Sequence, residues 1–190
     1  MKHKASRELY AYWDQRRGAR SAPERAEIEP GAIRGVLSDA FIVALDRAAA
    51  HPLRLAGTRI CALFGRELKG ESFTALWASP SRSVVSSLLA ILADECVGTV
   101  AGAKAQNAAG EETDLELLLL PLGARRRSLA RAIGVLAPLK VPEWLGQSAV
   151  SELTLGSRRH VGASIENRLL PRFVTRGGRP GLTVYEGGRS

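Results

Sequence analysis

The chain has 190 residues, of which 45% are hydrophobic and 24% charged, values typical of one globular domain with room for extensions. No apolar run approaches the roughly 20 residues that a membrane-spanning helix needs, and residues 1–10 lack the apolar core of a signal peptide. We therefore expect a cytoplasmic protein, in which the two cysteines, Cys61 and Cys96, remain free thiols.

The formal net charge of +8 lies at the two ends of the chain. Residues 1–25 and residues 138–190 each carry a net charge of +4, whereas residues 26–137 hold twelve basic and twelve acidic residues. Basic ends can meet nucleic acid, an acidic partner or an anionic membrane surface. They are also typical of a solvated surface that is rich in arginine.

The first predicted element is an amphipathic helix over residues 4–17. Leu9, Tyr12 and Trp13 share one face of this helix, because Tyr12 and Trp13 follow Leu9 by about one helical turn. Such an aromatic face needs a partner, which is either the body of the protein or a second copy of the helix. We take these three residues as a candidate dimer seam. A polar connector follows to residue 30.

The middle of the chain alternates strands with short helices. Residues 39–46 and 52–56 predict two strands that can form a hairpin. A short helix over residues 59–65 and an apolar turn over residues 72–77 come next. Ser79-Pro80 then opens a longer helix up to residue 96, because serine caps free N–H groups and proline suits the first helical position.

Three further strands are predicted over residues 97–107, 113–120 and 128–136. This order predicts an α+β fold with a five-stranded antiparallel sheet and helices on one face, preceded by the N-terminal helix. Residues 151–155 predict one more short strand or helix. The expected organisation is an N-terminal helix and connector (residues 1–30), a central domain (residues 31–137) and a basic C-terminal extension (residues 138–190).

Three segments carry a resemblance to a known family: ELYAYWDQRRGARSAPERAEIEP, LRLAGTRICALFGRELKGESFTALW and LELLLLPL. Across roughly residues 7–137, the chain resembles a PAS-like family that is common in alphaproteobacteria and mostly of undefined activity. The resemblance implies a sheet with a helical cradle, preceded by a helix that often mediates pairing. It also implies a role in sensing or coupling, and it carries over no catalytic site.

An apolar pocket in the cradle is the candidate ligand site. The alternative is that the same side chains fill the core and leave no room for a ligand. The candidate residues are apolar and come from the first strand, the two short helical segments and the long helix, namely Phe41, Val43, Cys61, Phe64, Phe73, Trp77 and Leu88.

Cofactor and metal chemistry find little support in the sequence. Flavin-binding photosensor PAS domains use a cysteine in a motif that ICALFGR, around Cys61, does not match. The long helix has no histidine that could ligate haem, and two cysteines 35 residues apart with three scattered histidines make no metal cluster. We expect neither a cofactor nor a metal.

The sequence also gives no catalytic constellation. No nucleophile elbow is present, and the glycine-rich segment at residues 65–72 has Glu71 where a phosphate-binding loop needs lysine. We expect that the protein is not an enzyme.

Arg125, Arg126 and Arg127, with Arg131, form a candidate anion patch, although such a turn is often only solvated.

The sequence therefore favours a stand-alone sensory or adaptor protein that acts through protein–protein interaction, as a homodimer and with a signalling partner. A small ligand in the cradle could modulate that interaction. The alternative is a protein that binds nucleic acid or an anionic nucleotide messenger through its arginine clusters.

Overall fold

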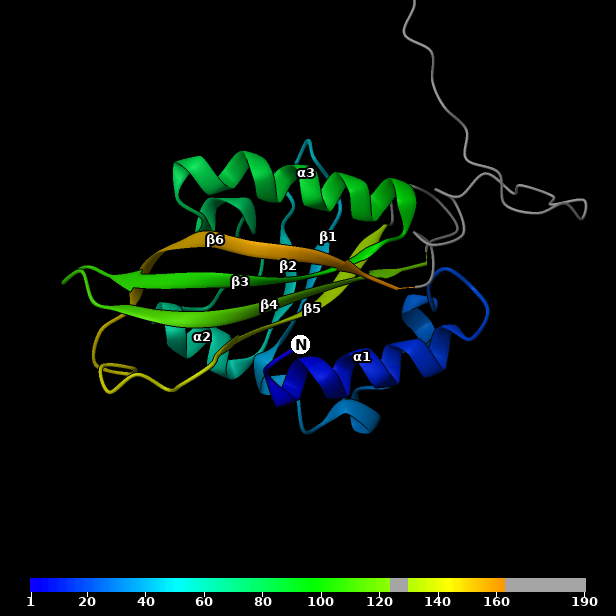
Figure 1. Cartoon of the computed structure of the whole chain (residues 1–190), viewed down its shortest axis with the longest axis horizontal. Helices are drawn as coiled ribbons and strands as arrows, with labels where there is room; N and C mark the ends of the chain where they lie inside the picture. The colour runs from blue at the N-terminus through cyan, green and yellow to red at the C-terminus, as the bar shows by residue number, and fades with distance from the viewer. Residues whose placement is uncertain (124–129, 163–190) are drawn as a thin grey trace, which may run out of the picture.

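The computed structural model describes residues 1–123 and 130–162 of the chain. These residues form an α+β fold in which one antiparallel sheet lies between helices, with α3 along one side and α1 along the other (Figure 1). The helices are α1 (Lys4–Arg17), α2 (Thr58–Phe64) and α3 (Ser79–Glu95). The strands are β1 (Ala40–Ala44), β2 (Leu53–Ala56), β3 (Gly98–Asn107), β4 (Glu112–Leu122), β5 (Arg131–Pro138) and β6 (Val150–Val161).

The sheet has six strands in the order β2-β1-β5-β4-β3-β6, and every neighbouring pair is antiparallel. The predicted α+β class and antiparallel sheet are confirmed, and the sixth strand, β6, adds to the predicted five. β4 pairs with both β3 and β5, and its residues Leu117–Leu120 are fully buried. Both faces of β4 are covered, which explains its unbroken run of leucines.

Side chains that alternate along the strands build two separate hydrophobic cores, one on each face of the sheet. The cradle core contains Phe41 together with the apolar faces of α2 and α3. The α1 core contains the next residue, Ile42, together with Leu9 and Trp13 of α1. Since neighbouring residues of one strand point to opposite faces, the sheet is shared by both cores.

Gly134 of β5 explains how the large ring of Phe41 is accommodated. The two residues lie opposite each other in the ladder between β1 and β5. A Cβ atom at position 134 would lie only 2.4 Å from Cζ of Phe41 and 2.3 Å from the backbone oxygen of Leu118. Glycine is therefore required here by the close approach of a ring, not by an unusual backbone conformation.

β6 belongs to the segment that the sequence assigns to a C-terminal extension, but it is integrated into the sheet. It pairs with β3 along most of its length, with a register shift opposite Ala101 and Ala103. Its other edge holds the start of α3, because Ala78 N–H donates to the Leu153 oxygen (2.8 Å). Leu155 N–H donates to Oγ of Ser81 (2.9 Å). The extension thus contributes a strand that fixes a helix.

Among residues 1–123 and 130–162, no helix combines the length and the hydropathy needed to cross a membrane.

Candidate functional site

The predicted cradle residues converge, and their side chains fill the space between them. Phe41 and Phe73 stack with ring centroids 5.1 Å apart, and Trp77 meets Phe73 edge-on at 6.0 Å. Val43 and Phe64 are buried in the same cluster, and Cys61 packs against it. Leu88 is buried on α3 but is not part of this cluster. In this conformation the candidate pocket is therefore packed core, which is the alternative left open by the sequence.

Cys61 lies on α2 at the border of the cradle core and is half-buried. Its thiol donates weakly to the Ala56 oxygen (3.9 Å) and approaches a carboxylate oxygen of Glu67 (3.6 Å). Burial, together with the negative charge of Glu67, raises the pKa of the Cys61 thiol above its ordinary value. A thiol held in its protonated form is a poor nucleophile, so Cys61 has the character of a packing residue.

The residues of the candidate dimer seam on α1 make contacts within one chain. Leu9 and Trp13 are buried against β4 and β5, and the indole N–H of Trp13 donates to the Pro121 oxygen (2.7 Å). The Tyr12 hydroxyl accepts a hydrogen bond from Glu29 N–H (2.9 Å) and holds the connector to the helix. The apolar face of α1 is covered by the protein's own sheet, which leaves little of it for a second copy.

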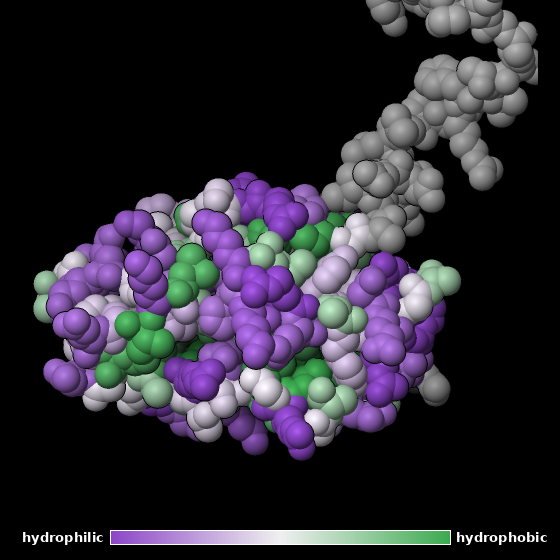
Figure 2. Space-filling view, turned by 60° about the horizontal axis from the view of Figure 1, so that its bottom comes forward, coloured by the Kyte–Doolittle hydropathy of each residue, from purple (hydrophilic) through white to green (hydrophobic). Residues whose placement is uncertain are grey.

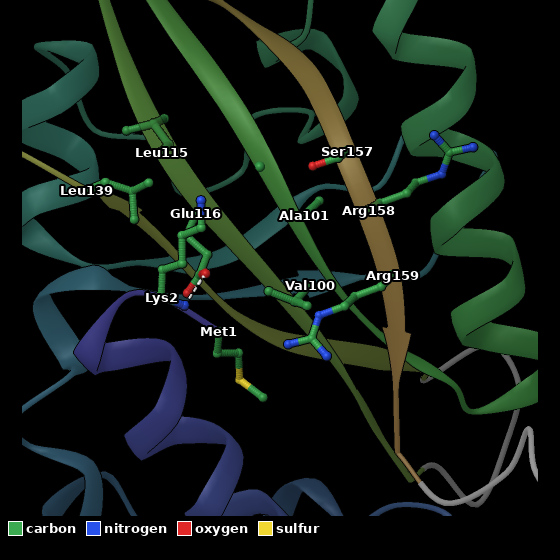
Figure 3. Close-up of a pocket in the computed structure, with 11 residues that line it drawn as sticks. Met1, Lys2, Val100, Ala101, Leu115, Glu116, Leu139, Ser157, Arg158 and Arg159 are labelled. Atoms are coloured by element: carbon green, nitrogen blue, oxygen red, sulfur yellow. Dashed lines mark hydrogen bonds between the residues drawn. The ribbon is translucent and has the colours of Figure 1, made fainter.

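A hollow of about 410 Å³ opens beside the start of α1, over strands β3, β4 and β6 (Figure 3). Gly102 has no side chain and leaves room in its floor, next to Val100. Leu139 borders the hollow, and Lys2 and Arg159 bring positive charge to it. The arrangement combines an apolar floor with a cationic rim.

Glu116 also lines this hollow and places one negative charge beside the cationic rim. Its carboxylate accepts hydrogen bonds from the backbone N–H groups of Lys2 (2.6 Å) and His3 (2.9 Å). Burial alone would raise the pKa of this carboxyl, but the N–H donors and the nearby N-terminal charge outweigh burial and hold the pKa below its usual value. Glu116 therefore stays ionised and anchors the N-terminal segment to β4.

Two cations at the hollow, Lys2 and Arg159, have no partner among the described residues. Within the part of the chain that the structure describes, neither the Lys2 ammonium nor the Arg159 guanidinium has a hydrogen bond or an ion pair. Arg158, the residue before Arg159, points to the opposite side of β6, toward α3 (Figure 3). Arg158 also lines the hollow, but of these two adjacent residues only Arg159 directs its side chain into it.

The predicted anion patch is only partly described. Arg125, Arg126 and Arg127 lie outside the described residues, and Arg131 is the half-buried first residue of β5. Among residues 1–123 and 130–162, no three His, Cys, Asp or Glu side chains form a group that could hold a metal ion.

A family model described as a PAS domain matches residues 1–137. The chain belongs to the PAS domain family. PAS domains are sensory modules, so this membership places the protein among sensory proteins and accounts for the sheet with its cradle of helices. The matched residues include α1 and β1–β4 and nearly all of β5, but not β6.

Solved structures of other PAS and LOV domains are similar to this one. The PAS domain of an HTR-like protein from Haloarcula marismortui has 15% identity and a TM-score of 0.42, covering 57% of this chain and 89% of its own. A LOV protein from Rhodobacter sphaeroides has 16% identity and a TM-score of 0.44, with coverages of 58% and 66%. The LOV domain of a blue-light activated histidine kinase from Erythrobacter litoralis has 14% identity and a TM-score of 0.42, with coverages of 54% and 95%. No curated protein matches the chain.

The sequence did not single out the residues of the hollow. Lys2 and Arg159 are 157 positions apart, and only the pairing of β6 with β3 brings them to the same face of the PAS sheet. The basic residues of the C-terminal segment indicated a charged surface. The alternation of apolar and polar residues that would identify a strand is weak in that segment. Polar residues occupy both faces of β6 from Ser157 to His160, so its strand pattern is weak.

Proposed function

We propose that this PAS protein is a sensory or adaptor protein that acts by contact with another protein. The observation that carries the proposal is the hollow beside α1, with its apolar floor and two unpaired cations. The packing of the cradle by the chain's own rings supports the same view, because a surface contact does not require an empty cradle. A cytoplasmic location is part of the proposal, in line with the free thiols of Cys61 and Cys96.

The chemistry of the hollow favours an acidic partner segment that also carries apolar side chains. Carboxylates of such a segment would pair with Lys2 and Arg159, while an aliphatic side chain would cover Val100 and Leu139. A second copy of this chain fits less well, because its own rim would bring positive charge against positive charge. We therefore place an acidic signalling protein, and not the homodimer expected from the sequence, at this surface.

Site-specific photo-crosslinking in the native host tests the proposal. A photoreactive amino acid replaces Arg159, which lies inside the hollow, and in the matched control it replaces Arg158 on the opposite face of the same strand. We expect a crosslinked protein from position 159 and not from position 158, with the attachment point in an acidic segment. Its yield should fall steeply as salt is added, because the contact is electrostatic.

Two results would contradict this function. One is equal crosslinking from both positions, which would mean that the hollow has no specific role. The other is a product at position 159 that contains only a second copy of this chain or nucleic acid, since either occupant replaces the acidic protein.

A further inference from the structure

A second hollow, of about 300 Å³, lies on the α1 side of the sheet at its other edge. It opens between the connector that follows α1 and the strands β1 and β2. Much of its lining is aliphatic. The large aliphatic residues that bear on the argument below are Ile28, Ile33, Ile42, Leu55 and Ile133. Figure 2 shows this side of the molecule, where hydrophobic surface appears in patches between hydrophilic residues.

This hollow lies on the α1 side of the sheet, because Ile42 and Ile133 belong to the α1 core. Phe41 of β1 also lines it, but the ring of Phe41 stacks on Phe73 in the cradle core. Leu55 lies directly opposite Ile42 in the ladder between β1 and β2, so its side chain is on the same face as Ile42. Leu55 is 40% exposed, although it is a large aliphatic residue. A ligand in this hollow would cover it.

Arg25 supplies the only charged side chain among the described residues that line the hollow. Its Nε atom is buried and has no hydrogen-bond partner in the described part of the chain. The neighbouring carboxylates are engaged elsewhere, because Glu27 binds Arg20 (2.8 Å) and Glu29 binds Arg16 (3.1 Å). A buried N–H group without an acceptor is costly, and an anion beside it would remove that cost.

We propose that this hollow binds an amphipathic carboxylate of the medium-chain fatty-acid type. The carboxylate accepts hydrogen bonds from the Arg25 guanidinium, and the hydrocarbon chain covers Ile42, Leu55 and Ile133. The size of the hollow lies at the lower end of the range for small-molecule sites, and its lining is largely apolar with one orienting polar group, as in such sites generally. A neutral hydrocarbon would leave Arg25 unpaired, and a small polar anion would leave Leu55 exposed to water.

Isothermal titration calorimetry of the full chain with decanoate, kept below its micelle concentration, tests the proposal. Decanol is the neutral ligand of matched length. We expect saturable binding of decanoate by the native protein and weaker binding of decanol. Arg25→Gln should weaken decanoate binding roughly tenfold or more and leave decanol binding unchanged, because the lost contact is a charge-assisted hydrogen bond. Arg54→Gln removes the same charge from exposed Arg54 of β2, outside the hollow, and should change neither.

Leu55→Glu is the second variant, because it puts a negative charge beside the hydrocarbon chain at a position that is exposed enough to tolerate it. It should weaken both ligands. Circular dichroism of each variant checks that the fold is kept. The proposal is overturned if native protein does not bind decanoate, if Arg25→Gln and Arg54→Gln have the same effect, or if Leu55→Glu leaves decanoate binding intact.

Discussion

Glu116 shows how one buried carboxylate can organise a chain terminus. It is 6% exposed and lies in β4 between Leu115 and Leu117, which are fully or almost fully buried. Two backbone N–H groups satisfy its charge, so its burial costs less than that of an isolated ion. The charge in turn fixes the residues that precede α1.

The lowered pKa of Glu116 makes stability depend on pH. A carboxyl whose pKa is lower in the folded than in the unfolded state contributes stability above its unfolded pKa, and loses it as pH falls through its folded pKa. Glu116→Gln should therefore reduce the free energy of unfolding by about 1–2 kcal/mol at neutral pH. The deficit should shrink as pH falls below the ordinary glutamate value of 4.5.

Urea unfolding of both proteins over a pH series measures this difference. Glu8→Gln is the matched control, since Glu8 on α1 is exposed and forms only a surface ion pair with Lys4. A deficit for Glu116→Gln that stays constant down to low pH would show that the charge of Glu116 does not hold the N-terminal segment.

The sequence indicated the position of Glu116 but not its role. In the sequence, Leu115, Leu117 and Leu119 alternate with Asp114 and Glu116, a pattern that predicts a strand with leucines on one face and Glu116 on a polar face. The leucines are indeed buried, but Glu116 is buried as well. Its partners lie more than 110 positions away at the start of the chain, and no local pattern predicts that such a segment covers that face.

At the scale of elements, α1 was predicted at its observed bounds, but its contact surface was not. Helical periodicity identifies an apolar face without saying what covers it. Here the face of Leu9 and Trp13 lies on the sheet of the same chain. The hydrogen bond from the Trp13 indole to the Pro121 oxygen fixes the register of that contact.

Replacement of Trp13 should therefore lower stability and leave self-association unchanged. Trp13→Ala removes a side chain that is 1% exposed and should cost about 3–5 kcal/mol, as for large aromatics in other cores. Because that loss can unfold the protein, Trp13→Phe is the milder variant, which keeps much of the packing but removes the N–H donor. Amide hydrogen exchange over residues 4–17 should accelerate in Trp13→Phe.

Tyr10→Phe is the matched control for Trp13→Phe, because it changes a partly exposed aromatic residue on the same helix. If Trp13→Ala lowered the mass in solution without a change in the free energy of unfolding, α1 would be a dimer seam as the sequence suggested.

At the scale of the whole molecule, β6 shows that the folded unit extends beyond the residues matched by the PAS family model. The match ends at residue 137, yet Val150 and Leu153 are buried in the cradle core. β6 also covers the edge of β3 and holds the start of α3. Loss of this strand would expose a long sheet edge, which favours aggregation.

A chain that ends after residue 137 should therefore fold poorly and aggregate, whereas a chain that ends after residue 162 keeps every contact described above. Size-exclusion chromatography and amide proton spectra of the two fragments measure this difference. A well-dispersed, monomeric spectrum of the shorter fragment would mean that β6 adds only a surface layer.

The fold of the central region was predictable because its signals are local. The apolar strands β1 and β4 and the approximate start of α3 follow from short stretches of sequence. The predicted cap was wrong, because Ala78 is the N-cap residue and no side chain caps the helix. The length of β6 and the two hollows depend on contacts between residues far apart in the chain. The roles proposed for Arg25 and Arg159 depend on the surfaces that tertiary structure places around them.

Because both cores share the same strands, we expect them to unfold together. Each core contains a tryptophan whose fluorescence can report on that unfolding. Trp13 lies in the α1 core and Trp77 in the cradle core, and both are almost fully shielded from solvent. Phe41 and Ile42 belong to different cores but are neighbours in β1, so one layer cannot melt without releasing the other. The fluorescence of the two indoles should consequently change together, as in a single cooperative transition.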